Sequence, residues 1–123
     1  MSERIIVINP NSTEDCTRGI DAAMDPLRIS GGPDIECMTM HEGPPGVESQ
    51  GDSDSVAIPI RDYVKARDND AGAFVIACFS DPGLHAAREA TEKPVLGIAE
   101  CAYMKAMTLG ETFGVISILE SSV

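Results

Sequence analysis

Short continuous runs of apolar residues are the strongest pattern along the chain. Three are clear and two are weaker, and they cover residues 5–8, 73–77 and 114–119, then residues 35–40 and 95–98. Strands that are buried on both faces of a parallel sheet have this continuous pattern, whereas half-exposed strands alternate apolar with polar residues. The pattern therefore predicts five buried strands.

Helix-like stretches lie between these runs. They cover residues 12–24, 55–67, 82–91 and 99–109. Pro26, Pro94 and Gly110 follow three of them as helix stops. Pro59 removes a backbone donor from the second stretch, so it predicts either a kink or the true first turn of that helix. Regular alternation of strand and helix predicts an α/β fold, a doubly wound parallel sheet with helices on both faces.

Length and composition indicate one domain with a small-molecule partner. The chain has 123 residues, of which 43% are hydrophobic, enough for a single core. Lys and Arg total 9 against 20 Asp and Glu, a net charge of -11 that would repel a phosphate backbone. We therefore expect no nucleic-acid partner.

Targeting and cysteine patterns point to a reduced, cytoplasmic protein. The N-terminus leads directly into the first apolar run without a signal-like segment, and no stretch is long enough to span a bilayer. We therefore expect no membrane partner. The four cysteines, at positions 16, 37, 78 and 101, form no CxxC motif. Their spacing therefore predicts neither a metal nor a redox site.

The chemistry of a doubly wound fold gathers at the carboxyl ends of its strands. Here the segments after the strands are residues 9–13, 41–53, 78–83 and 99–100. The 41–53 segment is longer than a typical connection, which is compatible with a binding loop and equally with a plain surface loop.

Cys78 is the candidate reactive group. It follows the run 73–77, and Ser80 or Asp81 can cap a helix whose first position is Pro82. A thiol facing unpaired helix amides is favoured as a thiolate, the form needed for a base or a nucleophile. The competing interpretation is a buried structural cysteine.

Rival chemistries are tested by spacing. A phosphatase-like thiol needs an arginine six residues later, where Leu84 stands. A papain-like nucleophile needs a histidine base, which His41 or His85 could supply. A phosphoacceptor domain needs aspartates at strand ends, but the residues there are Asn9 and Cys78.

The 9–13 segment is a second candidate site. Ser12 and Asp15 have the spacing of a capping box, so the segment predicts a helix start. The amide of Asn11, with the helix-end amides, could also hold a polar, carbonyl-rich ligand.

Four motifs together resemble the hydantoin and allantoin racemases of the aspartate/glutamate racemase superfamily. They are INPNST at 8–13, GPPGVES at 43–49, VIACFSDPGL at 75–84 and PVLGIAE at 94–100. The resemblance covers essentially the whole chain as the N-terminal half of such a protein. It implies one lobe of a pseudo-symmetric two-lobe fold, with the active site between the lobes and no metal, pyridoxal phosphate or nucleotide cofactor.

The resemblance also implies a reaction and a set of site residues. Members racemise 5-substituted hydantoins or allantoin, with one cysteine removing a proton and a second returning one on the opposite face. At the positions that match the family motifs, the resemblance implies that Cys78 is one of the two acid/base cysteines. The substrate-binding candidates are Asn11, Val47, Phe79 and Ser80.

The second cysteine of the family pattern has no counterpart here. Residues 1–111 are expected to form the first lobe, and residues 112–123 the opening strand of a second lobe that is missing. Cys16, Cys37 and Cys101 are expected to lie in the core, so the chain alone is expected to be inactive. Its apolar last strand favours a homo-oligomer or a frayed C-terminus.

Two alternatives stay open at this point. One is another enzyme of the superfamily, such as a maleate isomerase or arylmalonate decarboxylase. The other is a catalytically silent α/β module that binds a ligand or oligomerises.

Overall fold

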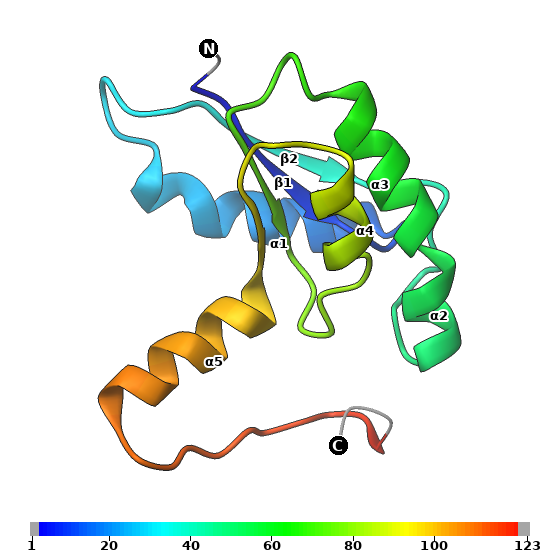
Figure 1. Ribbon diagram of the computed structural model, residues 1–123, viewed down its shortest axis with the longest axis vertical. Coiled ribbons are helices and arrows are strands. Elements are labelled where there is room, and N and C mark those ends of the chain that lie inside the picture. The colour runs from blue at the N-terminus through cyan, green and yellow to red at the C-terminus, as the bar shows by residue number, and fades with distance from the viewer. Residues whose placement is uncertain (1–2, 121–123) are drawn as a thin grey trace.

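A four-stranded parallel sheet is the centre of the protein, whose computed structural model describes residues 3–120 (Figure 1). The strands lie in the order β2-β1-β3-β4. Their bounds are β1 Ile5–Asn9, β2 Ile35–Thr39, β3 Ala73–Ile76 and β4 Val95–Gly97. The helices are α1 Glu14–Met24, α2 Gln50–Ser55, α3 Ala57–Ala66, α4 Leu84–Glu89 and α5 Ile98–Leu109, with a 3-10 turn η1 at Asp25–Leu27.

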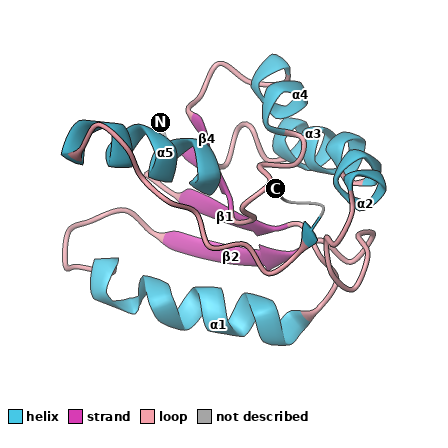
Figure 2. Ribbon diagram, turned by 90° about the horizontal axis from the view of Figure 1, so that it is seen from below, coloured by secondary structure: helices cyan, strands magenta, loops and turns pink. Residues whose placement is uncertain are grey.

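The prediction of a doubly wound parallel sheet is confirmed. β1 is central and pairs in parallel with β2 and with β3, so that Val7 lies between Cys37 and Val75. Helix α1 lies on one side of the sheet, and α3 and α4 lie on the other (Figure 2). Four of the five apolar runs therefore form the expected strands.

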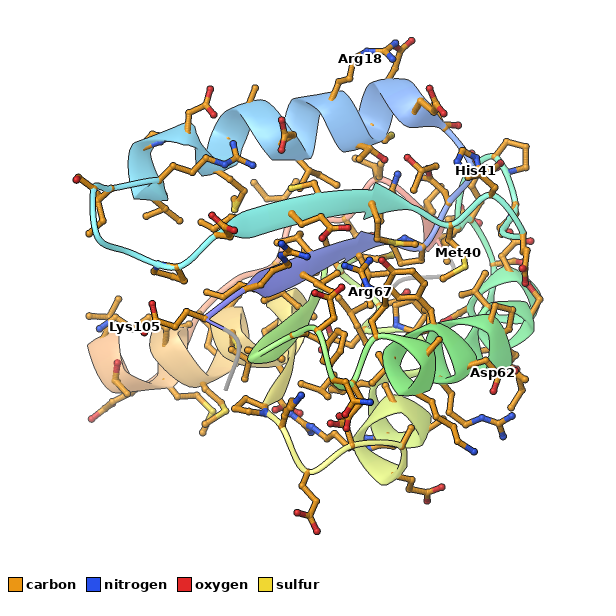
Figure 3. The ribbon with its side chains drawn as sticks, turned by 90° about the horizontal axis from the view of Figure 1, so that it is seen from above. Arg18, Met40, His41, Asp62, Arg67 and Lys105 are labelled. Carbon is orange, nitrogen blue, oxygen red and sulfur yellow. The ribbon has the colours of Figure 1, made fainter. Side chains whose placement is uncertain are left out.

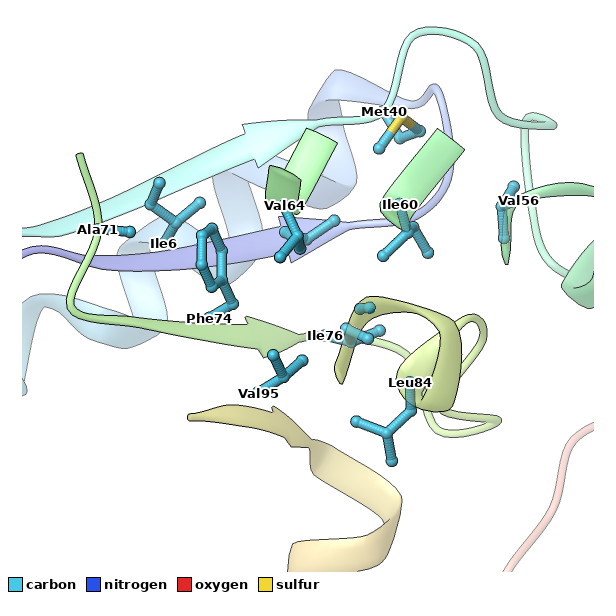
Figure 4. Close-up of a cluster of buried hydrophobic side chains, with 12 residues drawn as sticks. Ile6, Met40, Val56, Ile60, Val64, Ala71, Phe74, Ile76, Leu84 and Val95 are labelled. Carbon is cyan, nitrogen blue, oxygen red and sulfur yellow. The ribbon is translucent and has the colours of Figure 1, made fainter. Parts of the chain in front are cut away.

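The main core lies between the sheet and the pair of helices α3 and α4. Ile6, Phe74 and Ile76 point to this side and are completely buried against Ile60 and Leu84 (Figure 4). Burial of a side chain of this size contributes about 1.5–3 kcal/mol. Alternate residues of β1 and β3 make this core, while the intervening residues point to the opposite face of the sheet, the side on which α1 lies.

The predicted helix at residues 55–67 is α3, and a separate short helix, α2, precedes it in the long loop. Ser49 caps α2, and its hydroxyl oxygen accepts a hydrogen bond from the Asp52 amide at 3.0 Å. Pro59 lies in the first turn of α3, where the backbone amides have no partner within the helix in any case. The expectation that Pro59 marks a first turn is therefore confirmed, and the segment 41–53 is partly helical.

The predicted strand at residues 114–119 does not form in the described chain. Residues 112–117 have no regular secondary structure, because no neighbouring strand pairs with them. The side chains of Ile116 and Ile118 are almost fully exposed, and those of Met107 and Leu109 in α5 are mostly exposed. Residues 1–2 of the predicted first lobe (1–111) and residues 121–123 of the predicted start of a second lobe (112–123) lie outside the described residues.

None of the helices within residues 3–120 has the length and apolar character needed to cross a membrane.

Arg67 links α3 to the sheet at the amino end of β2 (Figure 3). Its guanidinium donates to both carboxylate oxygens of Glu36 at 2.9 and 2.8 Å, and also to Asp70 and to the Tyr63 hydroxyl. These hydrogen bonds from Arg67 lower the pKa of Glu36, with a further contribution from the charge of Arg4.

Replacing Glu36 by glutamine should lower the free energy of unfolding by about 0.5–1 kcal/mol at pH 7, since solvent screens this partly exposed pair. A carboxylate with a depressed pKa stabilises the fold above its unfolded value, 4.5, and this contribution disappears as the pH falls through the folded value. Urea unfolding from pH 7 to pH 3 should therefore show the wild type and Glu36→Gln converging at acidic pH. The exposed Glu42→Gln is the control, and a difference independent of pH would contradict the account.

Candidate active site

Cys78 follows β3 at the carboxyl end of the sheet. The Ala77 amide still donates to the Ile8 carbonyl at 2.8 Å, so the chain remains attached to β1 up to the residue before the cysteine. The Cys78 sulfur lies 3.5 Å from the Ser80 hydroxyl oxygen. The thiol is therefore partly buried at the strand end where doubly wound folds bind ligands.

Three of the four predicted binding residues meet Cys78 around one cavity. This cavity of about 260 Å³ is lined by Val47, Cys78, Phe79, Ser80, Tyr103 and residues 115–119. Val47 comes from the long loop, Tyr103 from α5 and residues 115–119 from the segment after α5, so these three segments meet the turn that carries the cysteine. The geometry brings these residues together, and their roles in binding stay predictions.

Asn11 is not among the residues that line this cavity. Its side-chain oxygen accepts from the Asn9 side-chain amide and from the Thr13 backbone amide, each at 2.9 Å. Thr13 is the N-cap residue of α1, so the predicted capping box at Ser12 and Asp15 is wrong. The side-chain oxygen of Asn11 thus accepts a hydrogen bond from the Thr13 amide and stabilises the turn before α1, and no hydroxyl caps the helix.

Asn9, which the sequence did not single out, also orders the turn at the start of α1. Only 2% of it is exposed, and its amide nitrogen also donates to the Thr17 hydroxyl at 3.0 Å. The signal was a polar residue at the end of an entirely apolar strand, since a buried amide must find partners.

The long loop is fastened to the start of α1. The Ser12 amide donates to the Pro44 carbonyl at 2.9 Å, and the Thr13 hydroxyl donates to the Pro45 carbonyl at 2.7 Å. These bonds hold the segment that carries Val47 beside the carboxyl end of β1.

Asp81 caps a different helix from the predicted one. Its carboxylate accepts from the Ala99 and Glu100 amides of α5 at 2.9 and 2.8 Å. Helix α4 begins only at Leu84, after Gly83 in the left-handed region. The prediction that Ser80 or Asp81 caps the helix after Cys78 is therefore wrong, and the carboxylate instead joins the Cys78 turn to α5.

This connection leaves no room for a side chain at position 97. A Cβ on Gly97 would lie 2.3 Å from the Asp81 carboxyl carbon, which requires glycine there. Asp81 itself has a φ of 47°, a left-handed conformation that Asp tolerates better than most residues.

The other three cysteines do not share the setting of Cys78. Cys16 and Cys101 are exposed on helices, so the expectation that they lie in the core is wrong. Cys37 is partly buried, and desolvation together with the neighbouring Asp21 carboxylate raises its pKa to about 11. Cys37 also borders a cavity of about 720 Å³. The lining of this cavity includes the loop before β2 and the first residues of β2, and none of its residues lines the Cys78 cavity.

Neither histidine lines the Cys78 cavity. His41 is exposed, with its Nε2 3.8 Å from a carboxylate oxygen of Glu14, and His85 lies exposed on α4. The arrangement therefore does not favour a papain-like pair. Across residues 3–120 no three His, Cys, Asp or Glu side chains are grouped as a metal site would require.

The family model described as Asp/Glu/Hydantoin racemase matches residues 5–123. The chain belongs to this racemase family. It is 42% identical over 118 residues to a hydantoin racemase of Pseudomonas sp. (strain NS671), covering 94% of this chain and 47% of that protein. A hydantoin racemase of Paenarthrobacter aurescens is 36% identical, with 94% of this chain and 50% of that protein covered. The predicted family is thus confirmed.

Solved structures agree with this assignment. The allantoin racemase from Pseudomonas fluorescens superposes with a TM-score of 0.88 at 31% identity, over 98% of this chain and 51% of that one. The allantoin racemase from Klebsiella pneumoniae gives 0.79 at 38% identity, over 87% and 44%. The chain spans about half the length of the racemases it matches.

In this member of the racemase family, substitution of Gly97 by alanine should destabilise the fold by about 1–3 kcal/mol, because the methyl group displaces the Asp81 carboxylate. Asp81→Gly removes the obstructing group and suits the left-handed backbone. In that background Gly97→Ala should cost less, with a coupling of about 0.5–3 kcal/mol in urea unfolding. Strictly additive effects would show that the two residues are not in contact.

Proposed function

We propose that this chain forms the first lobe of a cofactor-independent racemase of 5-substituted hydantoins or allantoin, with Cys78 as one of two acid/base cysteines. The observation that carries the proposal is the position of Cys78 at the carboxyl end of β3, in a cavity lined by Val47, Phe79 and Ser80. The names of the relatives, hydantoin racemase and allantoin racemase, favour this reaction over a maleate isomerase or decarboxylase.

The proposed reaction is an exchange of one proton at C5 of the ring. A cysteine thiolate removes the C5 proton, and the electron pair left behind delocalises into the adjacent carbonyl. A second cysteine thiol then delivers a proton to the opposite face of the planar intermediate, which inverts the centre. Fixed hydrogen-bond donors stabilise the developing oxyanion better than water, which would have to reorient.

The residues around Cys78 have distinct proposed roles. The Ser80 hydroxyl, 3.5 Å from the sulfur, can orient the thiol or thiolate by a hydrogen bond. Val47 and Phe79 provide apolar walls that exclude water from the carbanion. The side-chain oxygen of Asn11 is already used within its turn, which leaves its NH₂ group to donate to a carbonyl of a ligand reaching the end of β1.

We propose that the second cysteine comes from a second lobe. Cys37 is the middle residue of β2, borders a different cavity and is held as a neutral thiol by its raised pKa, while Cys16 and Cys101 line no part of the Cys78 cavity. Residues 1–111 would form the first lobe and residues 112–123 would begin the second. The exposed apolar side chains Met104, Met107 and Leu109 of α5, which line no part of the Cys78 cavity, suit packing against a second lobe or against another copy in a homo-oligomer.

A reducing, cytoplasmic location fits the proposal, since all four cysteines are free thiols in the structure and a catalytic cysteine must stay reduced.

The test is polarimetry with the intact protein as its gene encodes it, using single enantiomers of 5-substituted hydantoins and of allantoin, with maleate as the competing substrate. Racemisation is expected, and Cys78→Ser should lower kcat/KM by about 10²- to 10⁴-fold, the usual contribution of an acid/base group. The exposed Cys16→Ser is the matched control and should retain activity. The 123-residue chain by itself should not racemise these substrates. Turnover of maleate alone, or full activity in Cys78→Ser, would refute the proposal.

A further inference from the structure

Aromatic side chains are scarce in this protein, and three of them gather beside Cys78. The chain has 3 Phe, 2 Tyr and no Trp. The rings of Phe79 and Tyr103 meet edge to face with centroids 5.4 Å apart, and those of Tyr103 and Phe113 stack at 5.7 Å. Tyr103 is the central member of this aromatic cluster.

The position of Tyr103 relative to Cys78 is fixed by the Asp81 carboxylate and by the Phe79 ring. Tyr103 lies on α5, and the first amides of α5 are bound by Asp81, which belongs to the same turn as Cys78. Phe79, the residue next to the cysteine, supports the Tyr103 ring from the side. About 37% of Tyr103 remains exposed, so the ring has a surface available to a ligand.

Two cavities meet at the Tyr103 ring. The first, of about 260 Å³, contains Cys78 and Ser80. The second, of about 320 Å³, is lined by Ala102, Ala106 and Phe113 together with residues 114–116, and it offers no charged side chain. Phe79 and Tyr103 line both cavities. A ligand whose reactive carbon lies at Cys78 can therefore extend along Tyr103 into an apolar space.

We infer that Tyr103 is a specificity-determining residue that selects hydantoins with a bulky apolar substituent at C5. This inference rests on the proposed function, because it places C5 at the Cys78 sulfur. The substituent packs on the Tyr103 ring and fills the second cavity. Allantoin carries a ureido group at the same carbon, whose N–H and C=O groups would lose water without finding partners on Ala102, Ala106 and Phe113.

The test compares kcat/KM of the intact protein for 5-benzylhydantoin, 5-methylhydantoin and allantoin, in the wild type, Tyr103→Phe and Tyr103→Ala. An aromatic contact of this kind supports about a tenfold effect. Tyr103→Ala should therefore lower kcat/KM about tenfold for the benzyl compound and less than about twofold for the methyl compound. Tyr103→Phe keeps the ring and should stay within about twofold of the wild type for both.

Equal losses for the benzyl and methyl compounds in Tyr103→Ala would show a merely structural role and overturn the inference. So would an unchanged benzyl preference, a loss in Tyr103→Phe as large as in Tyr103→Ala, or a wild-type preference for allantoin. In each of these cases the wild type still racemises a substrate, so the proposed function survives.

If the wild type racemises none of the three compounds, the proposed function fails. Dissociation constants then still test whether the Tyr103 ring binds the apolar substituent. Equilibrium dialysis of 5-benzylhydantoin and 5-methylhydantoin with the same three proteins should give the same roughly tenfold loss of discrimination in Tyr103→Ala alone. Equal affinity of the wild type for both compounds, or no effect of the substitution, would overturn the inference independently of catalysis.

Discussion

The parallel pairing of β1 with β3 is the constraint on which the rest of the structure depends. Ile8 lies opposite Ile76, so both strands end at the same edge, and the segments that begin at Asn9 and at Cys78 emerge side by side. A slip of one residue would turn Phe74 and Ile76 away from α3 and α4, exposing apolar side chains that are now completely buried. The energy of the core therefore holds the register that places the cysteine.

Polar contacts then fix the segments that follow the carboxyl ends of β1 and β3. Asp81 binds the first amides of α5 and so couples the Cys78 turn to the helix that carries Tyr103. At the neighbouring strand end, Asn9 and Asn11 order the start of α1 through their side-chain amides. A site organised in this way requires little rearrangement when charge develops in a bound ligand, as the proposed carbanion would require.

The sequence predicted the sheet and the position of Cys78 at a strand end because both depend on local patterns: continuous apolar runs and a polar segment that follows them. It could not predict that Asp81 caps α5, since that contact joins residues 18 positions apart and depends on how β4 pairs with β3. The position of Tyr103 beside the Cys78 cavity could not be predicted for the same reason. Its position in a helix carries no sign that the ring reaches Phe79, and Cys16 and Cys101 were wrongly expected in the core because helical position alone does not define the buried face.

Proton exchange at C5 tests the central claim, that Cys78 acts on one face of the substrate, most directly. Each enantiomer of a 5-substituted hydantoin is incubated in D₂O with the intact protein, and loss of the C5 proton is followed by NMR. The account predicts exchange of both enantiomers by the wild type, whereas Cys78→Ser should lose exchange of one enantiomer and retain it for the other, without inversion of either. Exchange of both enantiomers at the wild-type rate in Cys78→Ser would contradict it.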